Sequence, residues 1–223
     1  MGEAIGQMLP AALGVAISPL PIVAVVLMLV SRRGRANGPA FALGWIVGLA
    51  ILGAIVLSIS SGADASDGGE PVTWVSVLKL LLGALLLLVG VKQWRGRPRE
   101  QGEATTPKWM SALDTFTPVK AAGAGALLSG LNPKNTLLAI GGAAAIAGTG
   151  IATGQQVVAY ALFVVVATIG VGAPVALSIV MGDRSRKPLD EIKDWMGQNN
   201  AVIMVVLMLL LGVKLIGDGL SGL

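Results

Sequence analysis

The sequence contains no cysteine and no histidine among its 223 residues, and only 13% of its residues are charged. The missing cysteine excludes disulfide bonds, a thiol nucleophile and a thiolate metal site. The missing histidine removes the commonest general base and the commonest ligand of transition metals. A soluble domain usually carries about a quarter charged residues, so this chain has too few to cover a surface that faces water. With 54% hydrophobic residues, it is predicted to be an integral membrane protein.

Long apolar segments predict where the chain crosses the membrane. A helix needs about 20 apolar residues to span the hydrocarbon core. Six segments approach or exceed this length: 5–30, 39–60, 73–93, 119–146, 154–181 and 199–217. The charged residues within them are all lysines, and every Asp and Glu lies outside. The predicted fold is therefore an all-α integral membrane protein with six transmembrane helices.

Basic residues are concentrated in alternate connections between these segments. The connections 31–38, 94–118 and 182–198 are basic, whereas 61–72 is acidic and 147–153 carries no charge. Basic loops remain in the cytoplasm, so we expect both termini to lie outside the cytoplasmic membrane. The long connection 94–118 is predicted to be a cytoplasmic linker between two halves.

The halves 1–93 and 119–223 resemble each other. The third segment ends in Leu-Leu-Val-Gly-Val-Lys (87–92) and the sixth in Leu-Leu-Leu-Gly-Val-Lys (209–214), and lysine is rare in such apolar surroundings. With three spans in each half, the second half must enter the membrane from the opposite side. The pattern therefore predicts two inverted three-helix repeats, an arrangement found in many transporters.

Proline interrupts the first span of each half near its middle, at Ser18-Pro19-Leu20-Pro21 and at Asn132-Pro133-Lys134-Asn135. Proline lacks an N–H and frees the carbonyl four residues earlier. In lipid a freed carbonyl costs several kcal/mol, so such backbone survives against protein or a watery cavity. Simple kinks are the alternative, but matching breaks in two halves favour a binding site near the bilayer midplane. The predicted substrate-binding residues are Ser18, Pro19, Pro21, Asn132, Pro133, Lys134 and Asn135.

Lys134 is the most unusual residue of these breaks. An ammonium near the bilayer centre costs at least about 2.5–3.5 kcal/mol, and no carboxylate within the six segments offers a partner. Two interpretations stay open: freed carbonyls compensate the charge, or Lys134 faces a cavity and binds an anionic ligand. In the second case, helix N-termini at the breaks would add positive charge.

The remaining intramembrane lysines and the glycine pairs have simpler interpretations. Lys79 lies about two turns into its segment and is predicted to reach outward along the helix. Gly44 and Gly48 are predicted to pack helices rather than bind a ligand. The lysines at segment ends are expected to be anchors, namely Lys92, Lys120 and Lys214.

The order of spans, with Ser-Pro-x-Pro at 18–21 and Asn-Pro-Lys at 132–134, resembles the LysE-type exporter superfamily. Within it, Gly-x-x-x-Ser-Pro-x-Pro at 14–21 and the stretch 131–135 are most similar to the GAP family of glycolipid- or sulfolipid-addressing proteins. This resemblance implies a small membrane protein that is needed to move envelope glycolipids to the cell surface. Leu20 replaces the glycine of the amino-acid exporters, which weakens the transfer of their substrate to this chain.

The predicted function is a transporter or flippase for an anionic lipid or its precursor. One alternative is an exporter of an amino acid or other small metabolite. Another is a non-transporting scaffold that docks lipid-synthesis enzymes through 94–118 and 182–198. An enzyme is not expected, because the membrane segments offer no nucleophile–base pair and no pair of acid–base carboxylates.

No catalytic residue, metal ligand or cofactor is predicted. The expected partners are membrane lipids and an anionic lipid or small-molecule substrate, with a homodimer or the envelope-lipid export machinery as further candidates. Nucleic acid is not expected, because the basic residues are spread over short loops without a recognition helix or an aromatic platform.

Overall fold

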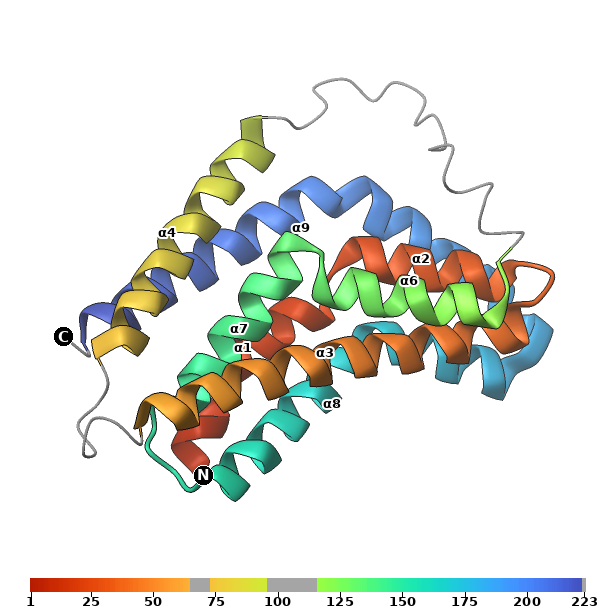
Figure 1. The fold of residues 1–223 in the computed structure, drawn as a ribbon. Helices are drawn as coiled ribbons and strands as arrows, with labels where there is room; N and C mark the ends of the chain where they lie inside the picture. The colour runs from red at the N-terminus through yellow and green to blue at the C-terminus, as the bar shows by residue number, and fades with distance from the viewer. Residues whose placement is uncertain (65–72, 96–115, 222–223) are drawn as a thin grey trace.

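A computed structural model describes residues 1–64, 73–95 and 116–221 of the chain. All regular secondary structure within these ranges is helical, as the sequence predicts. The elements are α1 (Gly2–Ala16), α2 (Pro19–Val30), α3 (Gly34–Asp64), α4 (Thr73–Arg95), α6 (Pro118–Gly130), α7 (Pro133–Ala147), α8 (Thr153–Met181), the 3-10 helix η2 (Gly182–Ser185) and α9 (Arg186–Leu220) (Figure 1). Most of the predicted linker 94–118 lies outside the described residues.

Two helices begin earlier than predicted. α3 starts at residue 34 instead of 39 and α9 at residue 186 instead of 199, so the charged connection 182–198 is helical and not a loop. Pro188 stands in the first turn of α9, where its missing N–H costs no helical bond. Leu189 is buried, and Lys193 Nζ lies 2.8 Å from Asp190 Oδ1 one turn away. Charge predicts where a helix leaves the hydrocarbon, which need not be where the helix begins.

Among the described residues, three helical stretches are long and apolar enough to cross a membrane: Gly34–Ser60, Ser76–Arg95 and Thr153–Leu220, which covers α8 and α9. The pair α1 and α2 makes a fourth if the two helices, which bend by 50° at their break, form one span. The chain thus has the features of an α-helical membrane protein. Six spans and an inverted repeat stay predictions.

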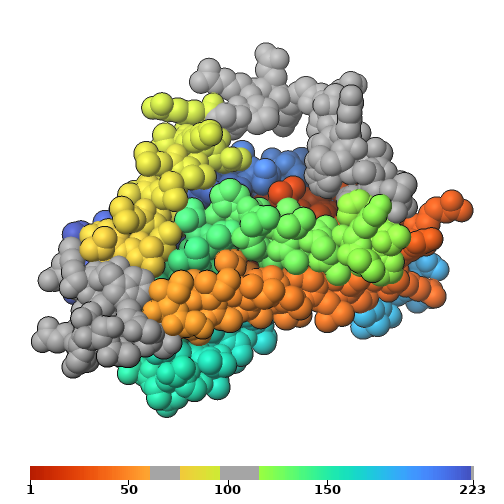
Figure 2. All heavy atoms as spheres, viewed as in Figure 1, coloured from red at the N-terminus to blue at the C-terminus, as the bar shows by residue number. Residues whose placement is uncertain are grey.

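α3 and α6 lie side by side, and their surfaces run along each other in Figure 2. A Cβ added to Gly44 would lie 1.9 Å from the carbonyl oxygen of Ala122, and one added to Gly48 would lie 2.1 Å from Ser129 Oγ. Glycine therefore allows the two helices to approach this closely. The prediction that Gly44 and Gly48 pack helices is confirmed.

The buried core lies where α1, α3, α7 and α8 meet, and α1 packs against both α7 and α8. Trp45 of α3 and Phe163 of α8 are fully buried in it. On one flank, α4 packs along α9 (Figure 1). Because α1 lies against α7, the break that ends α1 comes close to the break that starts α7.

Candidate functional site

The two helix breaks have the same local geometry. Two residues separate α1 from α2, and two separate α6 from α7. The N-cap residues Ser18 and Asn132 both have extended backbones, with φ/ψ of −79°/110° and −69°/115°. Pro19 and Pro133 then occupy the first position of the next helix, which needs no N–H donor. Each proline therefore begins a new helix instead of kinking a continuous one.

Lys134 reaches from one break to the other. Its Nζ donates a hydrogen bond of 2.6 Å to the carbonyl oxygen of Gly14 in α1. In a continuous helix this carbonyl would accept the N–H of Ser18. The position of Pro19 predicts that the Val15 carbonyl is free. In the structure, however, this carbonyl accepts the N–H of Ser18 at 3.2 Å. The free carbonyl is thereby shifted back by one residue, from Val15 to Gly14.

A second contact joins the breaks through neutral side chains. Ser18 Oγ donates to Asn135 Oδ1 at 3.1 Å, and Asn135 Nδ2 donates to the carbonyl of Leu128 at 3.2 Å. Thr136 Oγ1 donates to the carbonyl of Gly130 at 2.7 Å. Side chains of the first turn of α7 therefore satisfy carbonyls that the end of α6 leaves without helical partners.

The ammonium of Lys134 has a backbone carbonyl, that of Gly14, as its hydrogen-bond partner. The residue is 2% exposed, and within the described ranges no carboxylate comes within 4.0 Å of its ammonium. A hydrogen bond to a charged group contributes about 1.5–3 kcal/mol, and the C-terminal end of α1 also favours a cation. Together these effects offset an insertion cost of about 2.5–3.5 kcal/mol. The first of the two interpretations, a lysine held by a freed carbonyl, is the arrangement in this structure, and the anionic ligand stays a prediction.

The predicted site residues divide into a buried group and a peripheral one. Asn132 is half-buried, and its Oδ1 caps α7 by accepting the backbone N–H of Lys134 at 3.2 Å. Pro133 is exposed and contributes the helix start rather than a contact. The buried members are Ser18, Pro19, Pro21, Lys134 and Asn135.

Gly14 was not predicted to be part of the site. Its carbonyl holds Lys134, and a Cβ added to it would lie 2.6 Å from Leu211 Cδ1 and 2.9 Å from Leu138 Cδ1. A small residue is therefore required where α1 meets α7 and α9. The sequence could have indicated this role, because Gly14 lies four residues before the N-cap Ser18. In an unbroken helix the N–H of Ser18 would donate to the Gly14 carbonyl, and the break removes this donor.

Lys79 does not reach outward as predicted. It is only 8% exposed, because α4 packs along α9, and the charges of Asp218 and Lys214 are among its neighbours. Lys214 Nζ donates to Asp218 Oδ2 one turn away on the same helix. Lys92 and Lys120 are exposed at helix ends, as expected of anchors.

Comparison with known proteins identifies a family. No curated protein matches the chain, and no solved structure matches it. A family model described as Sap, sulfolipid-1-addressing protein, matches residues 8–221, which include both helix breaks. This match agrees with the resemblance of the two break motifs to sulfolipid-addressing proteins. The chain therefore belongs to the family of Sap, the sulfolipid-1-addressing protein.

Proposed function

We propose that this protein moves an anionic envelope lipid across the cytoplasmic membrane and binds the lipid headgroup at the two helix breaks. The name of its family points to a sulfolipid as the kind of substrate. The observation that carries the proposal is the buried ammonium of Lys134, which has a backbone carbonyl as its partner and, among the described residues, no carboxylate within ion-pair distance. Resemblance to LysE-type exporters supports the same function.

An anionic headgroup would compete with Gly14 for the ammonium. A sulfate or phosphate group carries a net negative charge shared over its oxygens, whereas the Gly14 carbonyl offers only a dipole. Binding the headgroup would therefore add charge–charge attraction to the hydrogen bond that the ammonium makes with either acceptor. The N-termini of α2 and α7 both start at the breaks and add partial positive charge there. Ser18 Oγ and Asn135 Nδ2 are the neighbouring hydrogen-bond donors.

The helix contacts support an inverted repeat that relates α1 to α6, α2 to α7, α3 to α8 and α4 to α9. A two-fold relation of this kind requires contacts in matched pairs. α1 packs against α8 and α6 packs against α3, while α2 packs against α9 and α7 against α4. The pairs α3 with α8 and α4 with α9 are their own counterparts. We therefore propose six spans in two inverted halves, with an alternating opening on each side of the breaks.

Cysteine labelling tests the orientation directly, because the natural chain contains no cysteine. Ala36 and Ala152 are exposed and lie in connections predicted on opposite sides of the membrane. In intact cells, a membrane-impermeant maleimide should label Ala152→Cys and leave Ala36→Cys unlabelled until the cells are opened. Labelling of both variants in intact cells, or of Ala36→Cys alone, would contradict the proposed orientation.

Lipid movement is tested with purified protein in phosphatidylcholine vesicles. The probes are fluorescent phosphatidylglycerol and fluorescent phosphatidylcholine, and dithionite reports which probe molecules reach the outer leaflet. We expect faster movement of the anionic probe. Lys134→Met should slow it roughly ten- to a hundredfold, because the lost charge-assisted bond is worth about 1.5–3 kcal/mol. Lys120→Met makes the same chemical change at an exposed helix end and should leave the rate unchanged.

Two results would favour the alternative functions. An amino acid that competes with the anionic probe and is itself carried would favour an exporter of small metabolites. A cell that keeps normal lipid export after Lys134→Ala but loses it when residues 182–198 are replaced would favour a scaffold. A carrier predicts the reverse pattern.

A further inference from the structure

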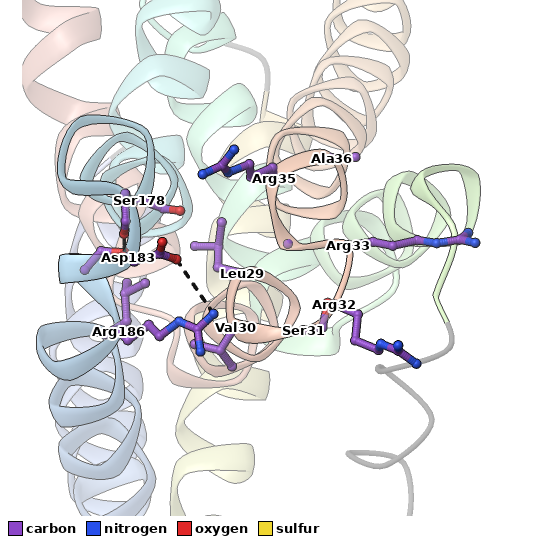
Figure 3. A pocket seen from close by; sticks show the side chains of 14 residues that line it. Leu29, Val30, Ser31, Arg32, Arg33, Arg35, Ala36, Ser178, Asp183 and Arg186 are labelled. Atoms are coloured by element: carbon purple, nitrogen blue, oxygen red, sulfur yellow. Dashed lines mark hydrogen bonds and ion pairs between the residues drawn. The ribbon is translucent and has the colours of Figure 1, made fainter.

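A pocket of about 390 Å³ lies away from the helix breaks, where two corners of the chain meet (Figure 3). One corner joins α2 to α3, and the other joins α8 through η2 to α9. A neighbouring cavity of about 240 Å³ shares part of its wall with this pocket. The residues common to both are Leu29, Arg35, Ser178 and Gly182.

The pocket is basic, and its arginines differ in direction. Arg32, Arg33, Arg35 and Arg186 all belong to its wall. In Figure 3 the side chain of Arg35 points towards the side of Ser178, whereas those of Arg32 and Arg33 extend in the opposite direction. Arg186 Nη2 lies 3.7 Å from Asp183 Oδ1, with both side chains largely exposed at 70% and 86%. Such an exposed pair contributes about 0–1 kcal/mol. The carboxylate of Asp183 therefore does not neutralise the pocket, which keeps a net positive charge. Arg35 and Arg186 are available to bind an anion there.

The neighbouring cavity provides an apolar continuation. Leu29, Pro39 and Ile179 line it, and Ile179 is 71% exposed. The next residue, Val180, is 83% exposed. Exposed apolar side chains of this size are expected to face lipid in a membrane protein. A cationic pocket thus shares a wall with a more apolar cavity beside a lipid-facing surface, which suits an amphiphile with an anionic end.

Glycine holds both corners in place. A Cβ on Gly34 would lie 1.9 Å from the carbonyl oxygen of Leu29, and one on Gly38 would lie 2.2 Å from Leu29 Cδ2. Gly182 has a φ of +55°, a conformation that other residues rarely adopt. Ser185 Oγ also donates to the Gly182 carbonyl at 2.6 Å. The pocket is therefore built into the backbone of both corners and does not depend on flexible side chains alone.

We propose that this pocket binds the anionic headgroup of a membrane lipid through Arg35 and Arg186, with the start of an acyl chain in the neighbouring cavity. The choice of a lipid rests on the proposed function, while the geometry is independent of Lys134. α2 connects the two places: its 12 residues run from the break at Ser18 to this pocket, a length of about 18 Å. The pocket is then the site where a lipid is first held before its headgroup reaches the breaks.

The test uses the full chain in phosphatidylcholine nanodiscs, with a fluorophore on Val180→Cys, an exposed position next in the chain to Ile179 of the cavity wall. Spin-labelled phosphatidic acid and spin-labelled phosphatidylcholine quench the fluorophore in proportion to their occupancy. We expect phosphatidic acid to be preferred at least about tenfold, since two charge-assisted contacts form. Arg35→Gln with Arg186→Gln should abolish this preference. Arg32→Gln with Arg33→Gln removes the same net charge and should retain it.

Further measurements distinguish a lipid headgroup from free phosphate as the ligand, and distinguish this proposal from the one for the helix breaks. Excess inorganic phosphate should not displace the lipid, and displacement would overturn the assignment of a lipid ligand. Asp183→Asn should increase the preference, which gives a gain that misfolding cannot produce. Lys134→Met should keep the preference even if lipid movement fails, so the pocket and the break site are judged separately. Equal losses in both arginine pairs, or no preference in the wild type, would overturn the proposal.

Discussion

Replacing Lys134 with methionine should slow lipid movement roughly ten- to a hundredfold while leaving the fold intact. The change deletes a buried ammonium that is 2% exposed but keeps an unbranched side chain of similar length. It also removes the hydrogen bond to the Gly14 carbonyl. A structural lysine and a ligand-binding lysine differ in what this substitution does to stability, so the comparison separates the two roles.

The magnitudes follow from the contacts. Removing the ammonium recovers an insertion cost of about 2.5–3.5 kcal/mol. It also loses the hydrogen bond to the Gly14 carbonyl, which costs about 1.5–3 kcal/mol with the carbonyl left unpaired. The net change therefore lies between roughly 0.5 kcal/mol of destabilisation and 2 kcal/mol of stabilisation. Asn135→Leu provides the contrast, because it leaves Ser18 Oγ and the Leu128 carbonyl without their partner. Two such orphaned groups cost about 2–6 kcal/mol.

Thermal unfolding of the purified protein in neutral detergent measures both variants. For a chain of this size about 1 kcal/mol corresponds to a change of 2–4 °C in Tm. Asn135→Leu should therefore lower Tm by at least about 4 °C, and Lys134→Met should unfold at a higher temperature than Asn135→Leu. If Lys134→Met is the less stable of the two, the ammonium is a structural element and its proposed role in ligand binding is wrong.

Three further substitutions test the packing and the surface charges by the same unfolding measurement. Gly170→Ala would place a Cβ 1.8 Å from the carbonyl oxygen of Ala16. α8 must then move away from α1, at a cost of about 1–3 kcal/mol or more. An unchanged Tm would contradict this close contact. Tyr160→Phe deletes a 3.0 Å hydrogen bond to a carbonyl of α3 and should cost about 0.5–1.5 kcal/mol. Asp190→Asn should cost less than about 1 kcal/mol, because its partner Lys193 is partly exposed. The hydrogen bond to Asp190 raises the pKa of Lys193 above its ordinary 10.5. The stabilisation by this pair is therefore present below pH 10.5 and is lost as the pH rises through the raised pKa. A Tm difference between Asp190→Asn and wild type that persists in strongly alkaline buffer would contradict this.

The sequence predicts the features that depend on local chemistry. Proline at 19 and 133 lacks a donor wherever the chain goes, so both breaks could be predicted without coordinates. Gly44 and Gly48 lie four residues apart on one helix face, and this spacing alone indicates close packing against a neighbour. Apolar length predicts the helices themselves.

Features that depend on tertiary register could not be predicted in the same way. The partner of Lys134 is set by how α7 lies against α1, and the sequence gives no distance between residues 14 and 134. Lys79 is buried by the packing of α4 on α9, which its position in the chain does not indicate. The arginine pocket requires two corners, near residues 34 and 182, to meet across the fold. Sequence patterns along one helix contain no information about such contacts between distant parts of the chain.

The short helix α2 links the proposed lipid pocket to the breaks, and its contacts indicate how they would communicate. Lys134 bonds to Gly14 on α1, so a shift of α2 leaves that contact in place. Ser18, at the start of α2, bonds to Asn135, so the same shift must break or re-form this hydrogen bond. Leu29, near the other end of α2, is held by Gly34 and Gly38 at the wall of the pocket. A lipid that enters the pocket and displaces α2 would therefore act first on the hydrogen bond between Ser18 and Asn135. Removing this neutral hydrogen bond should uncouple the pocket from the breaks, even though both binding sites keep their charged residues.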